Sequence, residues 1–251
     1  MRTHFALRMT LRLPIRLCRA TALSTLVTLA ALVSSAGGFA STQAAQAQAV
    51  APGKWYGFNL AGAEWNETNL PGVRGVDYVY DNDPKRYRYF ESKGMTLVRI
   101  PFRWERIQAT ANGPLSAADV AGLRTMLNQA RNHGQGAILV VQNFGHYYER
   151  PLDADDTATF ADQWSRLSAE FKGHDGLFGY ELMNEPRDMP GGAATWARLA
   201  QAATDAIRSQ DQTHWVLVPG YHWQTAASWR TYNENLAITD SAGRLLYAAH
   251  Q

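Results

Sequence analysis

The chain has 251 residues, of which 46% are hydrophobic and 18% charged, with 24 basic against 22 acidic side chains. This ordinary globular composition excludes a disordered, collagen-like or coiled-coil protein. Five of the basic residues and none of the acidic ones lie in residues 1–49, so the remainder carries a net charge of −3. We therefore do not expect a nucleic-acid partner.

Residues 1–49 are predicted to be a signal peptide with an Ala/Gln-rich leader. Five arginines precede the apolar stretch 20–33, and small residues before position 50 suit a signal peptidase. The stretch is shorter than the roughly 18 residues of a spanning helix, and an uncleaved anchor is the alternative. Cleavage would remove Cys18, the only cysteine. We expect a secreted or periplasmic protein without disulfide bonds or membrane attachment, with residues 50–251 as one catalytic domain.

Apolar segments alternate with helical patterns along the rest of the chain. Strands are predicted at 55–60, 96–100, 137–141, 177–183, 215–218 and 245–249. Helices are predicted at 84–92, 117–132, 157–171, 193–208 and 225–232. This alternation is typical of βαβ units and a parallel sheet.

Two architectures fit this pattern, an open doubly wound sheet and a closed barrel. A dinucleotide-binding sheet would place G-x-G-x-x-G after its first strand, and residues 59–65 lack it. Polar residues instead follow the strands' carboxyl ends: Arg99, His146, Asn184, Glu185 and His250. Because those ends meet on one face of a barrel, we predict an α/β fold of the TIM (β/α)8 type.

The tripeptide Asn184-Glu185-Pro186 is the strongest candidate for chemistry. Pro186 cannot extend the strand and should hold Glu185 in an extended conformation. A carboxyl group fixed at a strand end could protonate a leaving group. The alternative is a structural glutamate paired with a nearby arginine.

Five segments occur in an order that carries a family resemblance: 57–65, 97–108, 180–186, 218–223 and 248–251. Together they resemble glycoside hydrolase family 5, whose cellulase-like members are (β/α)8 retaining glycosidases. The resemblance covers roughly residues 55–251.

The resemblance implies roles for four residues. Glu185 matches the acid/base, Asn184 the neighbour that binds the sugar 2-hydroxyl, Arg99 the arginine beneath the nucleophile, and His250 a histidine beside the cleavage point. Arg99 could instead be an ion pair of the barrel floor, and His250 a structural histidine.

Four further residues are candidates for substrate binding. The family's third strand usually ends in Asp-x-His-Asn-Tyr, whereas here His146 and Tyr147 stand out of register. Trp223 and Trp229 follow the fifth strand and could stack on pyranose rings. Core packing is the alternative for both tryptophans.

A retaining glycosidase needs two carboxyl groups about 5–5.5 Å apart. The resemblance places the second glutamate on a seventh strand, but only six strand segments are found before Gln251. We expect about six of eight βα units, a C-terminally truncated chain without its nucleophile, and a poorly folded or inactive polypeptide.

The expected function of the whole enzyme is that of a monomeric endo-β-1,4-glucanase that cleaves β-glucan by retaining double displacement. No cofactor or metal is expected, since the histidines lack His-Glu-x-x-His spacing. The alternatives are a β-mannanase of the same family and a catalytically silent carbohydrate-binding barrel. A periplasmic solute-binding protein would need a two-domain break in composition, which is not seen.

Overall fold

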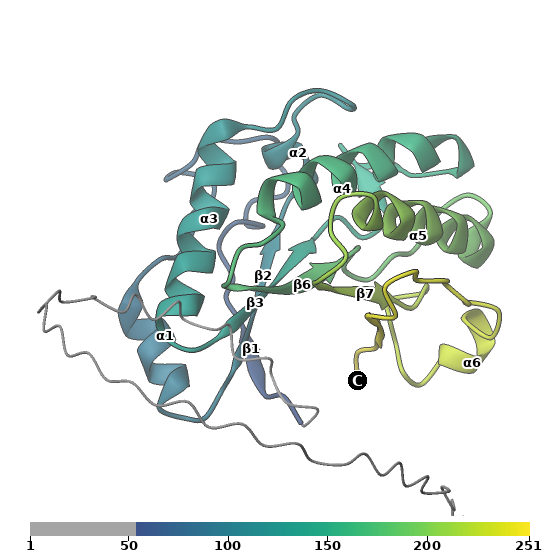
Figure 1. Ribbon diagram of the computed structural model, residues 1–251. Helices are drawn as coiled ribbons and strands as arrows, with labels where there is room; N and C mark the ends of the chain where they lie inside the picture. The colour runs from purple at the N-terminus through teal and green to yellow at the C-terminus, as the bar shows by residue number, and fades with distance from the viewer. Residues whose placement is uncertain (1–53) are drawn as a thin grey trace, which may run out of the picture. The chain divides into compact units, whose positions relative to one another are not determined.

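The computed structural model describes residues 54–251. The predicted signal peptide, its leader and Cys18 lie outside the described residues. A parallel sheet forms the centre of the described part, and its order along the sheet is β1-β2-β3-β6-β7-β8 (Figure 1). The strands are β1 (Gly57–Asn59), β2 (Leu97–Phe102), β3 (Gly136–Val141), β6 (Leu177–Glu181), β7 (Trp215–Pro219) and β8 (Leu245–Ala248).

The strand order distinguishes the two predicted architectures. A doubly wound sheet reverses its order at a switch point, whereas here each of the six strands pairs with the next one along the chain. Successive parallel strands without reversal are the arrangement of a (β/α)8 barrel. The predicted α/β barrel fold is therefore confirmed, with six parallel strands of the barrel present.

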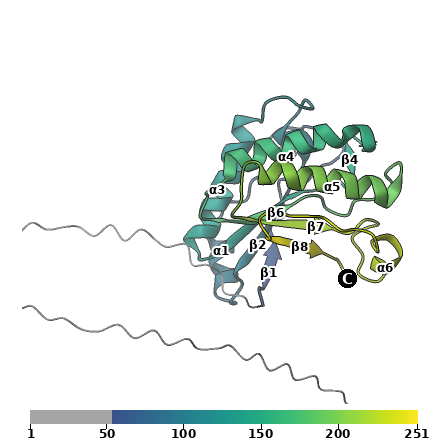
Figure 2. The same cartoon turned by 45° about the vertical axis from the view of Figure 1, so that its right-hand side comes forward.

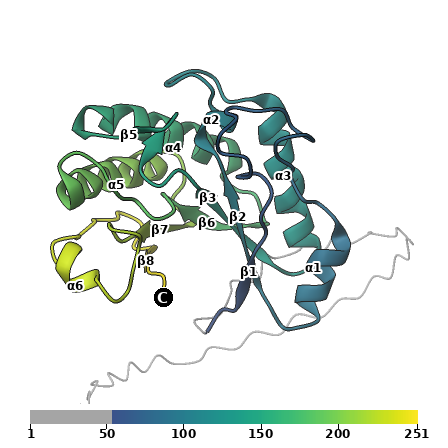
Figure 3. The same cartoon turned by 180° about the vertical axis from the view of Figure 1, so that it is seen from behind.

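The long helices cover one face of the sheet. They are α1 (Pro84–Glu91), α3 (Ala117–Asn132), α4 (Thr157–Phe171) and α5 (Gly192–Arg208). Figure 2 and Figure 3 show α3, α4 and α5 on the same side of the strands. Among residues 54–251, no helix combines the length and apolar character needed to cross a membrane.

Local sequence signals explain why the helix boundaries agree with the predictions. The hydroxyl of Ser116 accepts a hydrogen bond from the Asp119 amide at the start of α3. Gly134, with φ of +65°, follows the end of that helix in the left-handed region. The predicted helix 225–232 is shorter than expected, since α6 comprises only Trp229–Tyr232.

Several short elements were not predicted: α2 (Trp104–Ile107), the antiparallel pair β4 (His146–Tyr147) and β5 (Arg150–Pro151), and the 3-10 helix η1 (Ala154–Asp156). The start of α2 shows why. Its first amide, that of Trp104, donates to the side chain of Asn143, 39 residues away, and no neighbouring residue caps the helix with its side chain. A tertiary contact of this kind leaves no local sequence signal.

Both faces of the sheet are apolar, as is typical of parallel strands. The outer face packs beneath the helices in one large core. The inner face carries a smaller cluster of Ile138, Val140, Phe178 and Leu217, flanked by Trp55, Leu97, Trp215 and Leu246. Its aromatic rings are in contact, with the centres of Phe178 and Trp215 6.3 Å apart.

A buried polar cluster ties the outer side of β6 to the loop before β7. The Tyr180 hydroxyl donates to Asp211 Oδ2 at 2.7 Å, and His214 Nδ1 lies 2.6 Å from the same oxygen. The Thr213 amide donates to Asp211 Oδ1 at 2.9 Å. Burial alone would raise the pKa of the Asp211 carboxyl, but the bonds from His214, Thr213 and Tyr180 outweigh it and hold that pKa well below its usual range.

Replacing Asp211 by Asn should destabilise the protein in a pH-dependent way. Because the pKa of this carboxylate is lowered by folding, its stabilising contribution is full above its unfolded pKa of about 4 and is lost as the pH falls through the lower folded pKa. We expect Asp211→Asn to lower the free energy of unfolding by about 1–3 kcal/mol at neutral pH, and by less below about pH 3. Denaturant unfolding across pH measures this. The exposed Asp155, substituted to Asn, is the control, and equal losses in both variants would contradict the assignment.

Candidate active site

Arg99 lies in the middle of β2, not at its end as predicted, because β2 continues to Phe102. Its side chain is the centre of a polar network that includes Asn59 and Glu181, the last residues of β1 and β6. Its Nε donates to Glu181 Oε2 at 2.7 Å, and its Nη2 donates to Glu181 Oε1 at 2.9 Å. Nη2 also donates to Asn184 Oδ1 at 2.9 Å, and Nη1 to Asn59 Oδ1 at 3.2 Å. The guanidinium thereby joins β1, β2 and β6 through one bidentate ion pair and two amide groups.

A β-bulge explains why Glu181 reaches this network. Ala137 pairs with Leu177, but the next residue, Ile138, pairs with Gly179, so Phe178 is an extra residue in β6. The shift changes which side chains of β6 face inward, and it places Glu181 opposite Val140 on the inner face. Gly179 is required there, because an added Cβ would lie 2.4 Å from the Trp215 carbonyl oxygen.

The loop after β7 completes the network from the opposite side. Gln224 is 1% exposed, and its Nε2 donates to Glu181 Oε1 at 3.2 Å. Its Oε1 accepts a hydrogen bond from the Glu185 amide at 3.2 Å. His222, Trp223 and Gln224 all have φ between +56° and +65°, in the left-handed region. This unusual run turns Gln224 inward while Trp223 stays 41% exposed.

Glu185 follows β6 with its carboxyl group partly accessible, its side chain being 29% exposed. The extended conformation predicted for Glu185 is wrong, because its φ is +47°. Hydrogen bonds on both sides hold the strained backbone: Asn184 donates its amide to Val141, and Pro186 accepts from the His222 amide. The rigid neighbourhood thus outweighs the local preference imposed by Pro186.

His250 lies against Glu185. Its Nδ1 is 3.0 Å from Glu185 Oε1. The His250 amide donates to the Gln224 carbonyl, and a parallel bridge joins His250 to Thr225. The structure therefore brings together Arg99, Asn184, Glu185 and His250, the four residues expected at the reaction centre.

The aromatic and histidine candidates divide into two groups. His146 Nδ1 lies 3.2 Å from the Phe144 carbonyl oxygen, which also accepts the Arg187 amide. Trp223 lies against the Arg187 guanidinium. Trp229 packs over Gly220, where an added Cβ would lie 2.5 Å from its ring, and its ring centre is 6.1 Å from that of Tyr247. The sugar-binding roles of these three residues stay predictions.

The prediction that Tyr147 binds the sugar substrate is wrong, because its side chain is buried. It is 9% exposed, its hydroxyl donates to the Gln108 carbonyl at 2.8 Å, and its ring centre is 4.5 Å from that of Trp104. Burial and a satisfied hydroxyl make Tyr147 part of the core.

Sequence reasoning missed Glu181, Gln224 and Asn59. The sequence did contain a signal for Glu181, since it is an acidic residue inside the apolar run 177–183. A buried acidic residue is rarely found without a partner, so its position predicts a buried ion pair. Gln224 and Asn59 carried none, since their side-chain directions depend on the loop after β7 and on the register between β1 and β2.

A cavity of about 410 Å³ adjoins the network at the end of β1. Asn59 lines it, together with residues that include Trp65, Tyr89 and Phe90. Trp65 and Tyr89 are 54% and 57% exposed. Flat aromatic faces of this kind suit the apolar faces of sugar rings. The cavity lies beside the Arg99 network and is not centred on Glu185.

Comparisons with known proteins point to one family. Residues 56–251 match the family described as cellulase, glycosyl hydrolase family 5. Probable endo-beta-1,4-glucanase B of Neosartorya fischeri is 32% identical over 88% of this chain and 65% of its own length. Endo-beta-1,4-glucanase B of Aspergillus niger is 30% identical over 79% of this chain and 58% of its own length.

Solved structures of two relatives share this fold. Pseudomonas stutzeri endoglucanase Cel5A in complex with cellobiose is 34% identical, with a TM-score of 0.72 over 77% of this chain and 58% of the other. XacCel5A in complex with cellopentaose is 35% identical, with a TM-score of 0.74 over 79% and 65%. The chain thus spans about three-fifths of the length of the relatives it matches.

Substituting Glu181 by Gln should destabilise the protein more than the same substitution in an exposed ion pair. Gln keeps the volume but loses the charge, and it leaves the Arg99 guanidinium, 18% exposed, without its carboxylate. We expect a loss of about 3 kcal/mol in the free energy of unfolding, measured with denaturant. Glu170→Gln, which breaks the half-exposed pair with Arg124, should cost less than about 1 kcal/mol. A Glu181→Gln loss no larger than this control would contradict the assignment.

Proposed function

The chain belongs to glycosyl hydrolase family 5, and from this membership we propose that the full-length protein carrying it is an endo-β-1,4-glucanase. The observation that carries the proposal is the position of Glu185. Its carboxyl group is the accessible end of an otherwise buried network, hydrogen-bonded to His250 and adjacent to Asn184, which Arg99 holds in place. A positioned carboxyl of this kind suits proton transfer to a glycosidic oxygen.

The proposed mechanism is a double displacement. In the first step Glu185 donates its proton to the glycosidic oxygen while a second carboxylate bonds to the anomeric carbon and the leaving sugar departs. In the second step the Glu185 carboxylate takes a proton from water, whose oxygen displaces the enzyme carboxylate and releases the sugar. Asn184, fixed by Arg99 at 2.9 Å, would donate from its amide nitrogen to the sugar 2-hydroxyl.

The second carboxylate is proposed to be a glutamate that residues 1–251 do not include. Glu181 is a poor candidate, because it is 3% exposed and both of its oxygens are engaged by Arg99, one of them also by Gln224. The curated relatives extend well beyond the aligned region, which supports looking for the nucleophile in the full-length protein.

The substrate is proposed to be a β-1,4-linked glucan. Support comes from relatives named as endo-beta-1,4-glucanases and from solved relatives in complex with cellobiose and cellopentaose. A β-mannanase and a catalytically silent carbohydrate-binding barrel are the competing proposals. Export is proposed from residues 1–49 alone, and cell fractionation of the full-length protein would test it.

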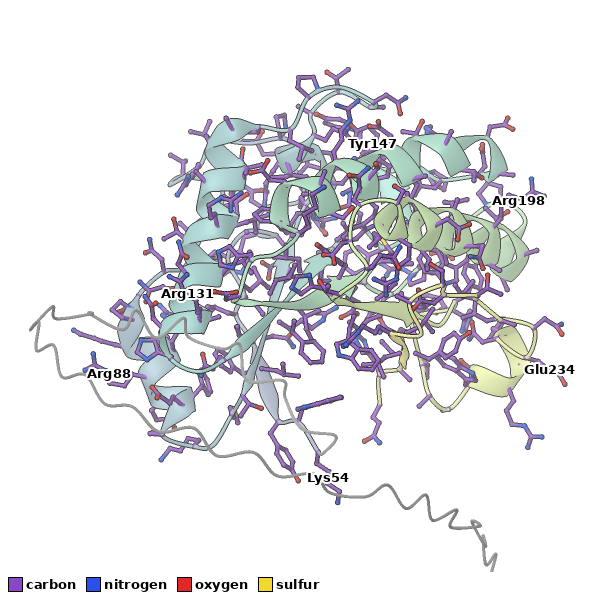
Figure 4. The ribbon with its side chains drawn as sticks, in the orientation of Figure 1. Lys54, Arg88, Arg131, Tyr147, Arg198 and Glu234 are labelled. Carbon is purple, nitrogen blue, oxygen red and sulfur yellow. The ribbon has the colours of Figure 1, made fainter. Side chains whose placement is uncertain are left out.

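Glu185→Gln should abolish most hydrolysis without abolishing binding. Losing the acid/base should lower kcat/KM on carboxymethylcellulose by about 10²–10⁴-fold, since Gln cannot transfer the proton. Reducing-sugar release by the full-length protein measures this. Glu234→Gln, at an exposed position labelled in Figure 4, is the matched control and should retain full activity.

The same assays separate the competing proposals. Faster hydrolysis of galactomannan than of carboxymethylcellulose would favour a β-mannanase. Binding of cello-oligosaccharides with no hydrolysis by the unaltered protein would favour the silent barrel. Full activity in Glu185→Gln would refute the role of Glu185.

A further inference from the structure

Arg187 is a charged residue beside Glu185 that takes no part in the proposed mechanism. Its Nη1 lies 3.7 Å from Glu185 Oε2, and its Nε lies 3.6 Å from Asp188 Oδ2. The guanidinium carbon is 4.4 Å from the ring centre of Phe144 and 5.7 Å from that of Trp223. The side chain is only 25% exposed, so these contacts restrict it closely.

Backbone hydrogen bonds fix the base of this side chain between three loops. The Arg187 amide donates to the Phe144 carbonyl at 3.2 Å, which joins the loops after β6 and β3. The His222 amide donates to the Pro186 carbonyl at 2.8 Å, which joins the loops after β7 and β6. The guanidinium therefore has a defined position relative to both rings and to Glu185.

The two oxygens of Glu185 have different surroundings. Oε1 is hydrogen-bonded to His250 at 3.0 Å. Oε2 faces Arg187 at 3.7 Å, a separation that gives electrostatic attraction but exceeds hydrogen-bond length. Among the described residues no hydrogen bond to Oε2 is found, so this oxygen can carry a proton without first breaking one.

We propose that Arg187 is a positioning residue that directs Glu185 Oε2 toward the leaving group, and that Oε2 is the proton-carrying oxygen. The inference rests on the proposed acid/base role of Glu185. His250 holds one oxygen. The arginine, fixed against Phe144 and Trp223, faces the other and stabilises the negative charge that develops there as the proton passes to the glycosidic oxygen, so the carboxyl group is constrained from both sides. Contact with two rings and a carboxylate suits the broad, planar guanidinium, whereas a lysine ammonium is a compact point charge.

Other charges near Glu185 do not duplicate this role. Arg99 is saturated by Glu181, Asn184 and Asn59, and it contacts the neighbour of Glu185, not its carboxyl group. Asp188 competes for Arg187 on the exposed side, where its own side chain is 64% exposed. A cation in contact with the Glu185 carboxyl is thus supplied by Arg187, with His250 contributing only when protonated.

Leaving-group dependence distinguishes positioning from a purely structural role. Cellopentaose has a poor leaving group that needs the proton from Glu185, whereas 2,4-dinitrophenyl cellobioside releases a stable anion without one. In the full-length protein, Arg187→Met should lower kcat/KM on cellopentaose by about 10–100-fold, comparable to the effect of misplacing a catalytic group by about 1 Å. On the dinitrophenyl substrate the change should stay within about threefold, because that step needs no acid catalysis.

Three further variants keep the test decisive. Phe144→Leu removes one ring while retaining the charge, and it should give the same leaving-group dependence with a smaller loss. The rate of Arg187→Lys on cellopentaose should fall between those of Arg187→Met and the unaltered protein, and an unaltered rate would overturn the requirement for a guanidinium. Arg198→Met changes an exposed arginine on α5, labelled in Figure 4, and should alter neither rate.

The outcomes separate this inference from the proposed function. Equal losses on both substrates in Arg187→Met and Phe144→Leu, or no loss on cellopentaose, would overturn the role of Arg187. Glu185→Gln in the same assays tests the acid/base role independently. If Glu185→Gln shows leaving-group dependence and Arg187→Met does not, only the present inference fails. If Glu185→Gln shows none, the proposed function fails with it.

Discussion

The ion pair between Arg99, in the middle of β2, and Glu181, the last residue of β6, is the constraint on which the surrounding polar groups depend. Charges removed from water are tolerated only when paired and fully hydrogen-bonded. Asn59, Asn184 and Gln224 provide the remaining hydrogen bonds, and each comes from a different segment. Because the pair needs these amides, it also fixes the side chain of Asn184 and, through Gln224, the backbone amide of Glu185. The buried ion pair therefore positions the backbone from which the accessible carboxyl group of Glu185 extends.

A single extra residue in β6 makes that arrangement possible. The bulge at Phe178 lets β6 present an aromatic side chain to the inner face at one position and a carboxylate at another, with Tyr180 directed outward to Asp211 between them. A regular strand would place residues 178 and 180 on the same face and Glu181 on the opposite one. The same irregularity thus supplies both the counter-charge for Arg99 and the anchor for the outer polar cluster.

The sequence predicts the elements better than the directions of their side chains. Apolar runs and helix caps, such as Ser116 before α3, are local signals and give boundaries close to those observed. Arg99, Asn184, Glu185 and His250 could be grouped in advance because strand ends converge in a barrel. Glu181 and Tyr147 could not be placed, since a bulge and a short hairpin decide which way each points. The conformation of Glu185 likewise depends on hydrogen bonds to distant loops, which override the preference set by Pro186.

The loop 222–224 has a consequence for how the protein could change. Three adjacent left-handed residues, none of them glycine, each carry a conformational cost of about 1–2 kcal/mol. Glycine at any of them would relieve that cost, yet it would delete the ring of His222 or Trp223, or the amide that connects Gln224 to Glu181 and Glu185. The preferred backbone conformation and the contacts of the side chains therefore favour different residues at this turn. At the exposed Trp223, selection for heat resistance alone would favour glycine, whereas selection for a functional side chain would preserve the strained residue. At Gln224 the buried hydrogen bond to Glu181 makes the side chain part of the stability itself.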